Sequence, residues 1–357
     1  MDDVLGVCHI SKGSRGIAEV SDRWPEIHPR SSLIMVQMNS TRNKMAASKS
    51  NEFKFIDLFA GIGGMRLGFE RAGGTCVFSS EWDKYSQKTY AANFGEIPHG
   101  DITQILEPEI PKFDVLLAGF PCQPFSTIGK RQGFEHPTQG TLFYDVVRIM
   151  RHHRNKAFLL ENVAGLKSHD GGRTLEVIEE ALTELGYKFD YKVLDAADFG
   201  VPQHRDRIYI VGYRSRKGGR VELDWPIGKK KPVPIGKFVQ AGVTGHSISK
   251  HLQDVYIYKK DDGRPQVIDA TSDIQVKTLV ASYHKIQRLT GTFVRDGETG
   301  LRLLTSDECK AIMGFPKNFK IPVSRTQMYR QMGNSVAVPV IAELAQWIAE
   351  DLIPNAK

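Results

Sequence analysis

Short apolar runs alternate with helix-forming segments between Phe53 and Tyr213, and this alternation constrains the fold more than any other feature of the chain. Strands and helices that follow one another with short turns are typical of an α/β fold with a mostly parallel sheet and helices on both faces. No helical pattern separates the last two apolar runs, which predicts a hairpin at a sheet edge. We predict strands over 53–59, 75–80, 113–118, 157–160, 187–195 and 207–213, and helices over 65–72, 84–93, 141–151 and 173–185.

The other segments differ from this alternating region in composition. Residues 1–52 are rich in Ser, Arg, Lys and Asn, so we predict a disordered extension, with a basic arm that touches nucleic acid as the alternative. Residues 214–303 contain many Pro and Gly residues and no long helical pattern, which predicts a smaller, irregular, β-rich domain. Residues 304–357 return to helical patterns, and Thr305 with Glu308 predicts a capping box. We expect this last segment to complete the domain formed by 53–213.

Charge and cysteine content restrict the class of protein. Lys and Arg outnumber Asp and Glu to give a net charge of +7, which is compatible with a polyanionic partner without requiring one. The four cysteines, Cys8, Cys76, Cys122 and Cys309, form no closely spaced pair, so we expect neither a disulfide framework nor a metal site. No apolar stretch is long enough to span a bilayer and no secretory pattern is present, which predicts a cytoplasmic protein without a membrane partner.

Two reactive side chains directly follow apolar runs. Cys122 comes after the run 113–118 and a Gly-Phe-Pro turn, and Glu161 follows the run 157–160. Because open α/β sheets place their chemistry at the carboxyl ends of strands, the pair indicates covalent catalysis with proton transfer. Burial would raise the pKa of the Glu161 carboxyl and let it donate a proton. The simpler alternatives are a cysteine that is inert in the core and a glutamate that reaches solvent.

A glycine-rich turn between the first strand and the first helix indicates a ligand that contains a nucleoside. Gly61, Gly63 and Gly64 permit a close approach to the backbone at a helix N-terminus. Glu81, at the end of the next strand, suits a ribose diol, and Trp82 suits an adenine ring, with core packing as its alternative. The turn lacks the dinucleotide spacing, so a small nucleoside cofactor is favoured over NAD.

Polar residues at two further turns extend this pattern. Asp101 and Ile102 are suited to bond the exocyclic amine of an adenine. Arg205 and Arg207, at the start of the last strand, are suited to bind a carbonyl or phosphate oxygen. The alternative for these arginines is a surface ion pair with Asp206.

Five segments, in this order, resemble the motifs of the C5-cytosine DNA methyltransferases of bacterial restriction-modification systems. They are 57–64 (DLFAGIGG), 119–123 (GFPCQ), 161–163 (ENV), 203–207 (QHRDR) and 333–336 (GNSV). The resemblance runs from Phe53 to the C-terminus. It implies the S-adenosylmethionine-dependent methyltransferase fold, with 53–213 and 304–357 as the catalytic and cofactor-binding domain and 214–303 as the target-recognition domain.

The same resemblance implies a set of ligands and partners. S-adenosyl-L-methionine would be the cofactor, S-adenosyl-L-homocysteine the product, and double-stranded DNA the substrate. The chain would act as a monomer at the bacterial nucleoid, with a cognate restriction endonuclease that acts separately.

Carried over residue by residue, the resemblance assigns the chemistry to four side chains. Cys122 attacks C6 of a flipped cytosine, Glu161 donates a proton to the base, Arg205 binds O2 of the base, and Arg207 supports the site. Residues expected to line the cofactor site are Phe59, Gly61, Gly64, Glu81, Trp82, Asp101, Ile102, Leu142 and Asn334. Residues expected to contact DNA are Gln123, Ser126, Lys130 and Arg131 in a closing loop, and Thr278, Leu279, Tyr283, Lys285 and Arg288 in the recognition domain.

Three other functions are compatible with parts of the pattern. A tRNA cytosine-5 methyltransferase shares the catalytic motifs, but that branch usually carries Cys-Phe-Thr in its recognition region, and this tripeptide is absent. A DNA-binding regulator with an inactive site is disfavoured because Cys122, Glu161 and Arg205 are intact. A nicotinamide oxidoreductase requires the dinucleotide turn that is missing.

Overall fold

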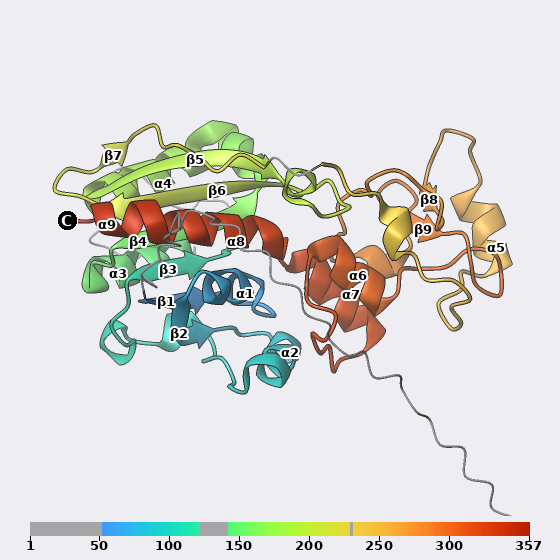
Figure 1. Cartoon of the computed structure of the whole chain (residues 1–357), viewed down its shortest axis with the longest axis horizontal. Helices are drawn as coiled ribbons and strands as arrows, with labels where there is room; N and C mark the ends of the chain where they lie inside the picture. Colours follow the sequence, from blue (N-terminus) through green and yellow to red (C-terminus); the bar gives the residue numbers. More distant parts are fainter. Residues whose placement is uncertain (1–51, 122–141, 229–230) are drawn as a thin grey trace, which may run out of the picture. The chain divides into compact units, whose positions relative to one another are not determined.

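A seven-stranded sheet lies at the centre of the alternating region (Figure 1). The computed structural model describes residues 52–121, 142–228 and 231–357, and all of these belong to one compact unit. The strand order is β2-β1-β3-β4-β6-β5-β7. The strands are β1 (Phe53–Leu58), β2 (Gly74–Ser80), β3 (Val115–Ala118), β4 (Ala157–Val163), β5 (Tyr187–Asp195), β6 (Asp206–Arg214) and β7 (Gly219–Arg220).

The direction of the strands determines where a ligand can bind. β2, β1, β3 and β4 are parallel neighbours, as the alternation of strands and helices predicts. β6 runs antiparallel to both β4 and β5, so the predicted hairpin forms, but its second strand lies inside the sheet. The chain leaves β1 for β2 on one side and returns to β3 on the other. The carboxyl ends of β1 and β3 therefore flank the crevice at which open α/β sheets bind ligands.

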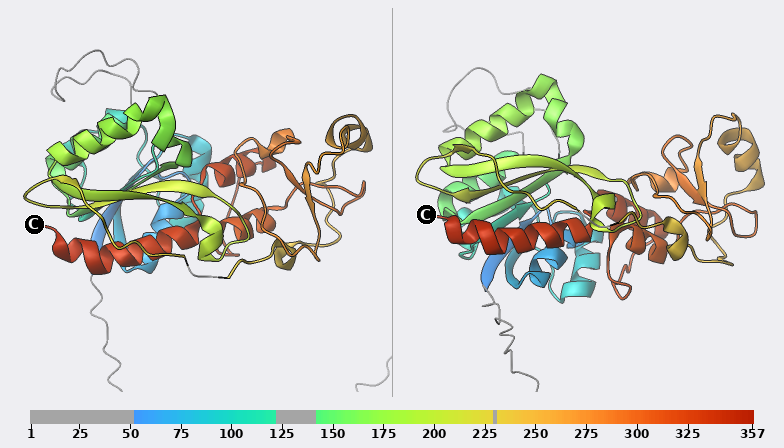
Figure 2. Two further views of the ribbon diagram at one scale, coloured as in Figure 1. Left: turned by 90° about the horizontal axis from the view of Figure 1, so that it is seen from above. Right: turned by 45° about the horizontal axis from the view of Figure 1, so that its top comes forward.

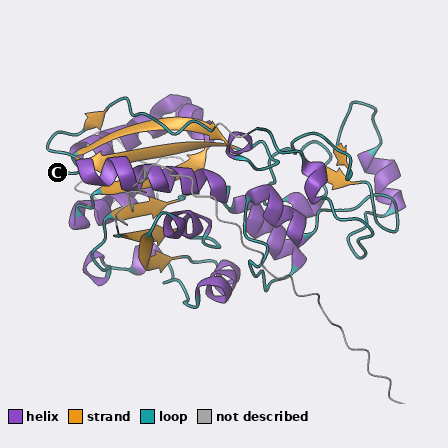
Figure 3. Ribbon diagram, viewed as in Figure 1, coloured by secondary structure: helices purple, strands orange, loops and turns teal. Residues whose placement is uncertain are grey.

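Helices cover both faces of the sheet (Figures 2 and 3). α3 (Phe143–His153) and α4 (Arg173–Glu184) share a core with Leu116 and Phe158 on one face. α1 (Gly64–Arg71) and α8 (Val338–Trp347) share a core with Leu117 and Leu159 on the other face. Because neighbouring residues of a strand point to opposite faces, a strand with two covered faces is apolar throughout. This explains why β3 has the sequence VLLA and why its four residues are all buried.

The irregular region between the sheet and the C-terminal helices contains a second sheet of two strands. These strands, β8 (Gln266–Ile268) and β9 (Thr292–Val294), are parallel. Their apolar side chains share one core with α6 (Ser306–Met313) and α7 (Arg325–Asn334). α6 begins with the predicted capping box. The backbone N–H of Glu308 donates to the Thr305 hydroxyl oxygen, and the backbone N–H of Thr305 donates to the Glu308 carboxylate. The two-stranded sheet and the helices α6 and α7 thus share one core.

The remaining helices and turns connect these parts. They are the helices α2 (Lys84–Phe94), α5 (Lys250–Leu252) and α9 (Ile353–Asn355), the 3₁₀ turns Ile102–Gln104, Glu107–Glu109, Ala164–Gly172, Ala196–Phe199, Ile235–Phe238 and Tyr283–Lys285, and the π turns Gln253–Ile257 and Ile348–Leu352. The helical pattern expected after residue 304 is observed near the C-terminus as α8 continued by a π turn. Among the described residues, no helix has the length and apolar character that crossing a membrane requires.

Two buried side chains just before β6 join the sheet to the segment around Leu279 and to α7. The side-chain amide oxygen of Gln203 accepts a hydrogen bond from the backbone N–H of Leu279 at 2.6 Å. The Arg205 guanidinium donates to the carbonyl oxygens of Leu279 at 3.1 Å, of Gly333 at 3.0 Å and of Ser335. Three segments that are far apart in the sequence are consequently held at one point beside the start of β6.

The close approach at Gly333 generates a testable prediction. A Cβ at this position would lie 2.1 Å from the backbone nitrogen of Ala281 and 2.2 Å from the carbonyl carbon of Val280. We expect Gly333→Ala to lower the free energy of unfolding by about 1–3 kcal/mol, because backbone atoms cannot move aside as a flexible side chain can. Urea denaturation measures this loss. Gly165→Ala is the control, since a Cβ there meets nothing within 4 Å, and equal stability of the two variants would contradict the prediction.

Candidate active site

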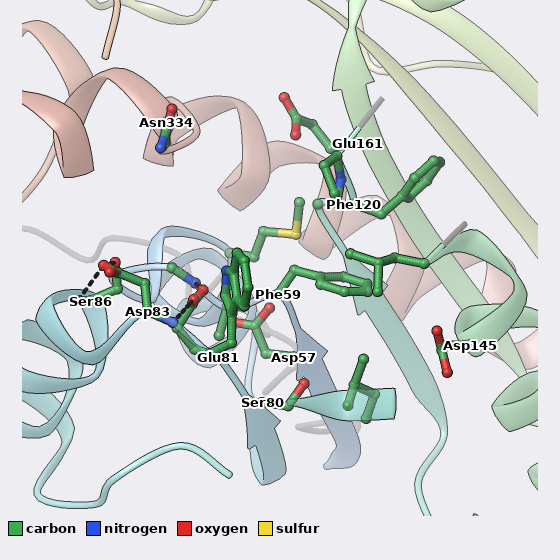
Figure 4. Close-up of a pocket in the computed structure, with 18 of the residues that line it drawn as sticks. Asp57, Phe59, Ser80, Glu81, Asp83, Ser86, Phe120, Asp145, Glu161 and Asn334 are labelled. Atoms are coloured by element: carbon green, nitrogen blue, oxygen red, sulfur yellow. Dashed lines mark hydrogen bonds between the residues drawn. The ribbon is translucent and has the colours of Figure 1, made fainter. Parts of the chain in front are cut away.

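A cavity of about 1320 Å³ lies at the carboxyl ends of the parallel strands (Figure 4). Its walls come from the turn after β1, the segment after β2, the segment after β3, the end of β4 and the end of α7. Pockets for a single small molecule usually have volumes of about 300–1,000 Å³. The cavity is therefore larger than a usual single-ligand pocket, and it lies at the position that the strand order predicts.

The predicted cofactor residues are all brought to this cavity. Phe59, Gly61, Gly64, Glu81, Trp82, Asp101, Ile102, Leu142 and Asn334 line its wall. Among the four predicted catalytic residues, Glu161 and Arg207 also line it, whereas Arg205 does not. Cys122, Gln123, Ser126, Lys130 and Arg131 lie outside the described residues.

Glu81 is fixed by backbone groups on both sides. One carboxylate oxygen accepts the backbone N–H of Gly61 at 2.8 Å, and the other accepts that of Asp83 at 2.7 Å. Burial raises the pKa of Glu81, and these two backbone N–H groups oppose the rise. Gly61 has a φ of 56°, a left-handed conformation that a glycine adopts without strain. The glycine turn thus orients an acceptor carboxylate toward the cavity.

Trp82 lies at the rim of the cavity with its ring uncovered. The residue is 79% exposed, so the alternative of core packing is wrong. A large aromatic ring in contact with water offers an apolar face to a flat ligand. Together with the fixed carboxylate of Glu81, it provides the groups that an adenosine would require.

Arg148 holds the segment that carries Asp101 and Ile102. From α3 its guanidinium donates to the carbonyl oxygen of Ile102 at 2.6 Å and to that of Ile105 at 2.9 Å. The same group pairs with Glu107 and Asp145. The sequence analysis missed this residue because an arginine in an amphipathic helix is most often a surface group, and its partners outside α3 are 41 to 46 residues away.

Asp57 is buried in the wall of the cavity without a hydrogen bond. The residue is 1% exposed, and neither carboxylate oxygen has a partner of ordinary geometry. Burial raises its pKa to about 7, and the charge and the backbone N–H of Arg66 oppose this rise. Asp57 is the first residue of the 57–64 motif, but the sequence does not reveal that its carboxyl is buried without a protein partner.

Glu161 and Arg207 form an ion pair in the part of the cavity nearest to β4 and β6. Nε of Arg207 lies 3.2 Å from a carboxylate oxygen of Glu161, and both side chains are largely buried. Burial raises the pKa of Glu161, and the charges of Arg207 and Arg205 oppose this effect. Figure 4 shows Glu161 facing the cavity across from Asn334. The pair offers a proton donor and a fixed cation to the same ligand.

Arg205 has a different environment from Arg207. It is 2% exposed, and its terminal nitrogens donate to backbone carbonyl oxygens of Leu279, Gly333 and Ser335. These bonds fix the backbone segments around Leu279 and Gly333, and Arg205 does not line the cavity. The geometry therefore favours the opposite of the sequence-based assignment, with Arg207 at the ligand and Arg205 in support.

Asn162 connects the ends of two strands in the site. Its side-chain amide donates to the carbonyl oxygen of Phe120 at 2.9 Å, and its own carbonyl oxygen accepts the backbone N–H of Val163 at 2.8 Å. Phe120 precedes Cys122 by two residues. The bond thus fixes the end of the segment from which the chain continues to Cys122.

The predicted DNA-contacting residues of the recognition region do not share one environment. Leu279, Tyr283 and Arg288 are buried, so they cannot reach base edges in this arrangement. Thr278 is half-buried and donates its hydroxyl to the carbonyl oxygen of His204. Lys285 is exposed. The expectation of direct contact with DNA is therefore corrected for the three buried side chains.

Comparisons with known proteins agree with this site. Residues 53–350 match the family model described as C-5 cytosine-specific DNA methylase. The chain is 58% identical over 300 residues to Type II methyltransferase M.MspI of Moraxella sp, covering 84% of this chain and 71% of that protein. It is 55% identical over 331 residues to Type II methyltransferase M.BsuFI of Bacillus subtilis, covering 91% and 80%. The crystal structure of the S. pombe Dnmt2 methyltransferase has the same fold, with a TM-score of 0.68, 21% identity, and coverage of 84% and 99%.

The unpaired carboxyl of Asp57 generates a prediction about pH. Its pKa of about 7 in the folded chain exceeds the ordinary value of 3.8, so the folded chain binds more protons than the unfolded chain between these values. Stability is then present at low pH and is lost as the pH rises toward 7. Asp57→Asn removes this titration. Between pH 5 and pH 8 we expect the variant to gain about 2–3 kcal/mol of unfolding free energy relative to the wild type. Urea denaturation at both pH values measures the difference, and a constant difference would contradict the pKa.

Proposed function

The chain belongs to the C-5 cytosine-specific DNA methylase family and is a DNA (cytosine-5)-methyltransferase, and from this premise we propose that Cys122, Glu161 and Arg207 carry its chemistry. The observation that supports the proposal is the buried Glu161–Arg207 ion pair, with 3.2 Å between its atoms, in the cavity that Glu81 and Trp82 also line. The ion pair, the Glu81 carboxylate and the exposed Trp82 ring thus line the same cavity.

Membership of the family implies the use of S-adenosylmethionine, and the residues present fit it. Glu81 would accept hydrogen bonds from the ribose hydroxyls, Trp82 would stack on the adenine, and Asp101 would accept from its amine. Asp57, whose buried carboxyl has no partner, is a further acceptor in the same wall. When bound, the cofactor supplies an electrophilic methyl group.

The protein residues make C5 of the cytosine nucleophilic. A cytosine inside a duplex hides its C6 atom, so the base is extruded into the cavity at a cost of a few kcal/mol. The Cys122 thiolate then adds to C6, and Glu161 delivers a proton to N3, which its raised pKa favours. Arg207 donates to O2 of the base. After methylation, a water molecule takes the C5 proton, the bond between C6 and the sulfur breaks, and the N3 proton returns to the Glu161 carboxylate, which restores the aromatic ring, the thiolate and the acid.

The remaining roles follow from membership of the family. We propose that 214–303 forms the target-recognition domain and that 53–213 with 304–357 forms the catalytic domain. Gln123, Ser126, Lys130 and Arg131 belong to the loop that closes over the duplex in this proposal. Water is then excluded from the cavity while the base is covalently bound.

A role in restriction-modification is the biological context that we propose. The relatives M.MspI and M.BsuFI are named Type II methyltransferases. A chain of this kind would methylate a short duplex sequence and thereby protect it from a separate endonuclease. The tRNA methyltransferase alternative is not favoured, because the family model and these relatives are those of DNA methylases.

Bisulfite sequencing tests the reaction and its nucleophile together. DNA from cells that express the chain should contain unconverted cytosines within one short sequence. Cys122→Ala should give complete conversion, because the covalent addition to C6 is lost. Cys76→Ala is the matched control and should retain protection, since Cys76 lies outside the cavity wall. Protection by the Cys122 variant would overturn the mechanism.

A duplex with 5-fluorocytosine at the target position isolates the covalent step. Fluorine cannot leave as the C5 proton does, so the wild type and the Cys76 variant should form a complex that survives denaturing electrophoresis. The Cys122 variant should form none. A stable complex with the Cys122 variant would assign the bond to another residue.

Variants of Arg207 and Arg205 distinguish a residue that contacts the base from one that positions the backbone around the site. Arg207→Lys should lower kcat by about 10²-fold or more with little change in thermal stability, because it removes donors directed at the reacting base. Arg205→Lys should lower the melting temperature, because one ammonium group cannot reach all three carbonyl acceptors. Single-turnover kinetics and thermal denaturation provide the two measurements. The reverse pattern would return the base contact to Arg205.

A further inference from the structure

One turn of the recognition region, residues 283–288, is held firmly at both ends. At its start the Tyr283 hydroxyl donates to the carbonyl oxygen of Thr292 at 2.6 Å and accepts the backbone N–H of Leu304 at 3.0 Å. At its end the Arg288 guanidinium donates to the carbonyl oxygens of Ile257 at 2.9 Å and of Lys260 at 2.8 Å. These two buried anchors fix the ends of the 283–288 turn independently of each other.

The backbone between the anchors is strained. Ile286 has a φ of 53° and a ψ of 53°, which is the left-handed helical conformation. A β-branched residue is disfavoured there, because its Cβ substituents crowd the following carbonyl. Such strain persists only where the surroundings impose it, and it is concentrated at ligand clamps and active sites.

At the centre of the turn, one ring nitrogen of His284 and the charge of Lys285 have no partner among the described residues, whereas the Gln287 side chain accepts a hydrogen bond from the Thr290 hydroxyl. Nδ1 of His284 is buried and lacks a hydrogen bond. Lys285 is exposed, and its ammonium takes part in no ion pair among the described residues. Buried polar atoms are nearly always satisfied, so an orphaned nitrogen beside a strained residue is a second, independent sign that the turn is shaped for a ligand.

The turn lies next to the wall of the active-site cavity. The Tyr283 ring packs edge-on against the ring of Tyr329 on α7, with 4.9 Å between the ring centroids. Ala281, two residues before the turn, approaches Gly333 closely, and Gly333 itself lines the cavity. A duplex that delivers an extruded base to this cavity must keep its neighbouring base pairs close to the cavity mouth. The turn is therefore placed to meet those pairs.

We propose that Lys285 is a specificity-determining residue that reads a guanine in the major groove next to the extruded cytosine. A lysine ammonium donates to O6 and N7 of guanine, and these acceptors distinguish G·C from the other base pairs in that groove. Tyr283 and Arg288 hold the turn, and Lys285 is exposed between these two anchors. The proposal rests on the proposed function, since it requires duplex DNA at the cavity.

The test measures sequence preference rather than activity alone. The methylated sequence is first read by bisulfite sequencing of the wild type. The ratio kcat/KM is then determined for duplexes that differ from it by one base pair at each position. In Lys285→Ala we expect discrimination at a single G·C pair to fall about 5- to 150-fold, the range of one bidentate base contact. Discrimination at every other position should be unchanged.

Two further variants define the outcome. Lys259→Ala removes the same charge from another exposed position of the recognition region, and it should keep the wild-type preference at all positions. Lys285→Arg retains a donor pair for guanine and should keep the preference at the same base pair, so it covers the case in which the alanine variant does not fold.

Three results would overturn the proposal or separate it from its premise. An equal loss of kcat/KM on every duplex in Lys285→Ala would show a phosphate contact and overturn the base contact. An unchanged preference in that variant would overturn it as well. If the wild-type chain leaves no protected cytosine, the proposed function itself fails; where the wild type does protect a sequence, either of the first two results overturns the base contact alone.

Discussion

Capture of the Leu279 backbone by Gln203 and Arg205 is the interaction on which the arrangement of the site depends. Gln203 accepts from the Leu279 N–H, and Arg205 donates to its carbonyl oxygen as well as to those of Gly333 and Ser335. The groups are buried, where an unpaired donor costs about 1–3 kcal/mol, so the bonds are expensive to break. One cluster thereby sets the position of the recognition region against the sheet and of α7 against the cavity.

The sequence predicted the sheet and the cavity because both follow from local patterns. Strand residues such as those of β3 are apolar throughout, and glycines or acidic residues follow them directly, so the carboxyl ends could be located without tertiary information. The capping box at Thr305 was predictable for the same reason, because its two bonds span only three residues. Every predicted cofactor residue lies at such a strand end or helix end, and all of them line the cavity.

Roles that depend on contacts distant in the sequence could not be predicted. Arg205 and Arg207 are two residues apart and chemically identical, and only the packing of Leu279 and Gly333 against one of them separates the frame from the cavity. Tyr283, Lys285 and Arg288 also lie close together in the sequence, yet Tyr283 and Arg288 are buried and hold the turn, whereas Lys285 is exposed. Arg148 reaches carbonyl oxygens that periodicity within α3 cannot reveal.

The reversed direction of β6 has a consequence for how the Glu161–Arg207 pair arises. In the antiparallel ladder Glu161 is opposite Tyr209 and Val163 is opposite Arg207, so the two charged residues are diagonal neighbours across one pair of strands. A parallel β6 of the same nine residues would carry Arg207 to the opposite rim of the sheet, roughly 25 Å away. A slip of one residue in the ladder would turn its side chain to the other face. The register of β4 and β6 thus sets the distance between the Glu161 carboxyl and the Arg207 guanidinium. The loop before β6 can vary in sequence only where this register is kept.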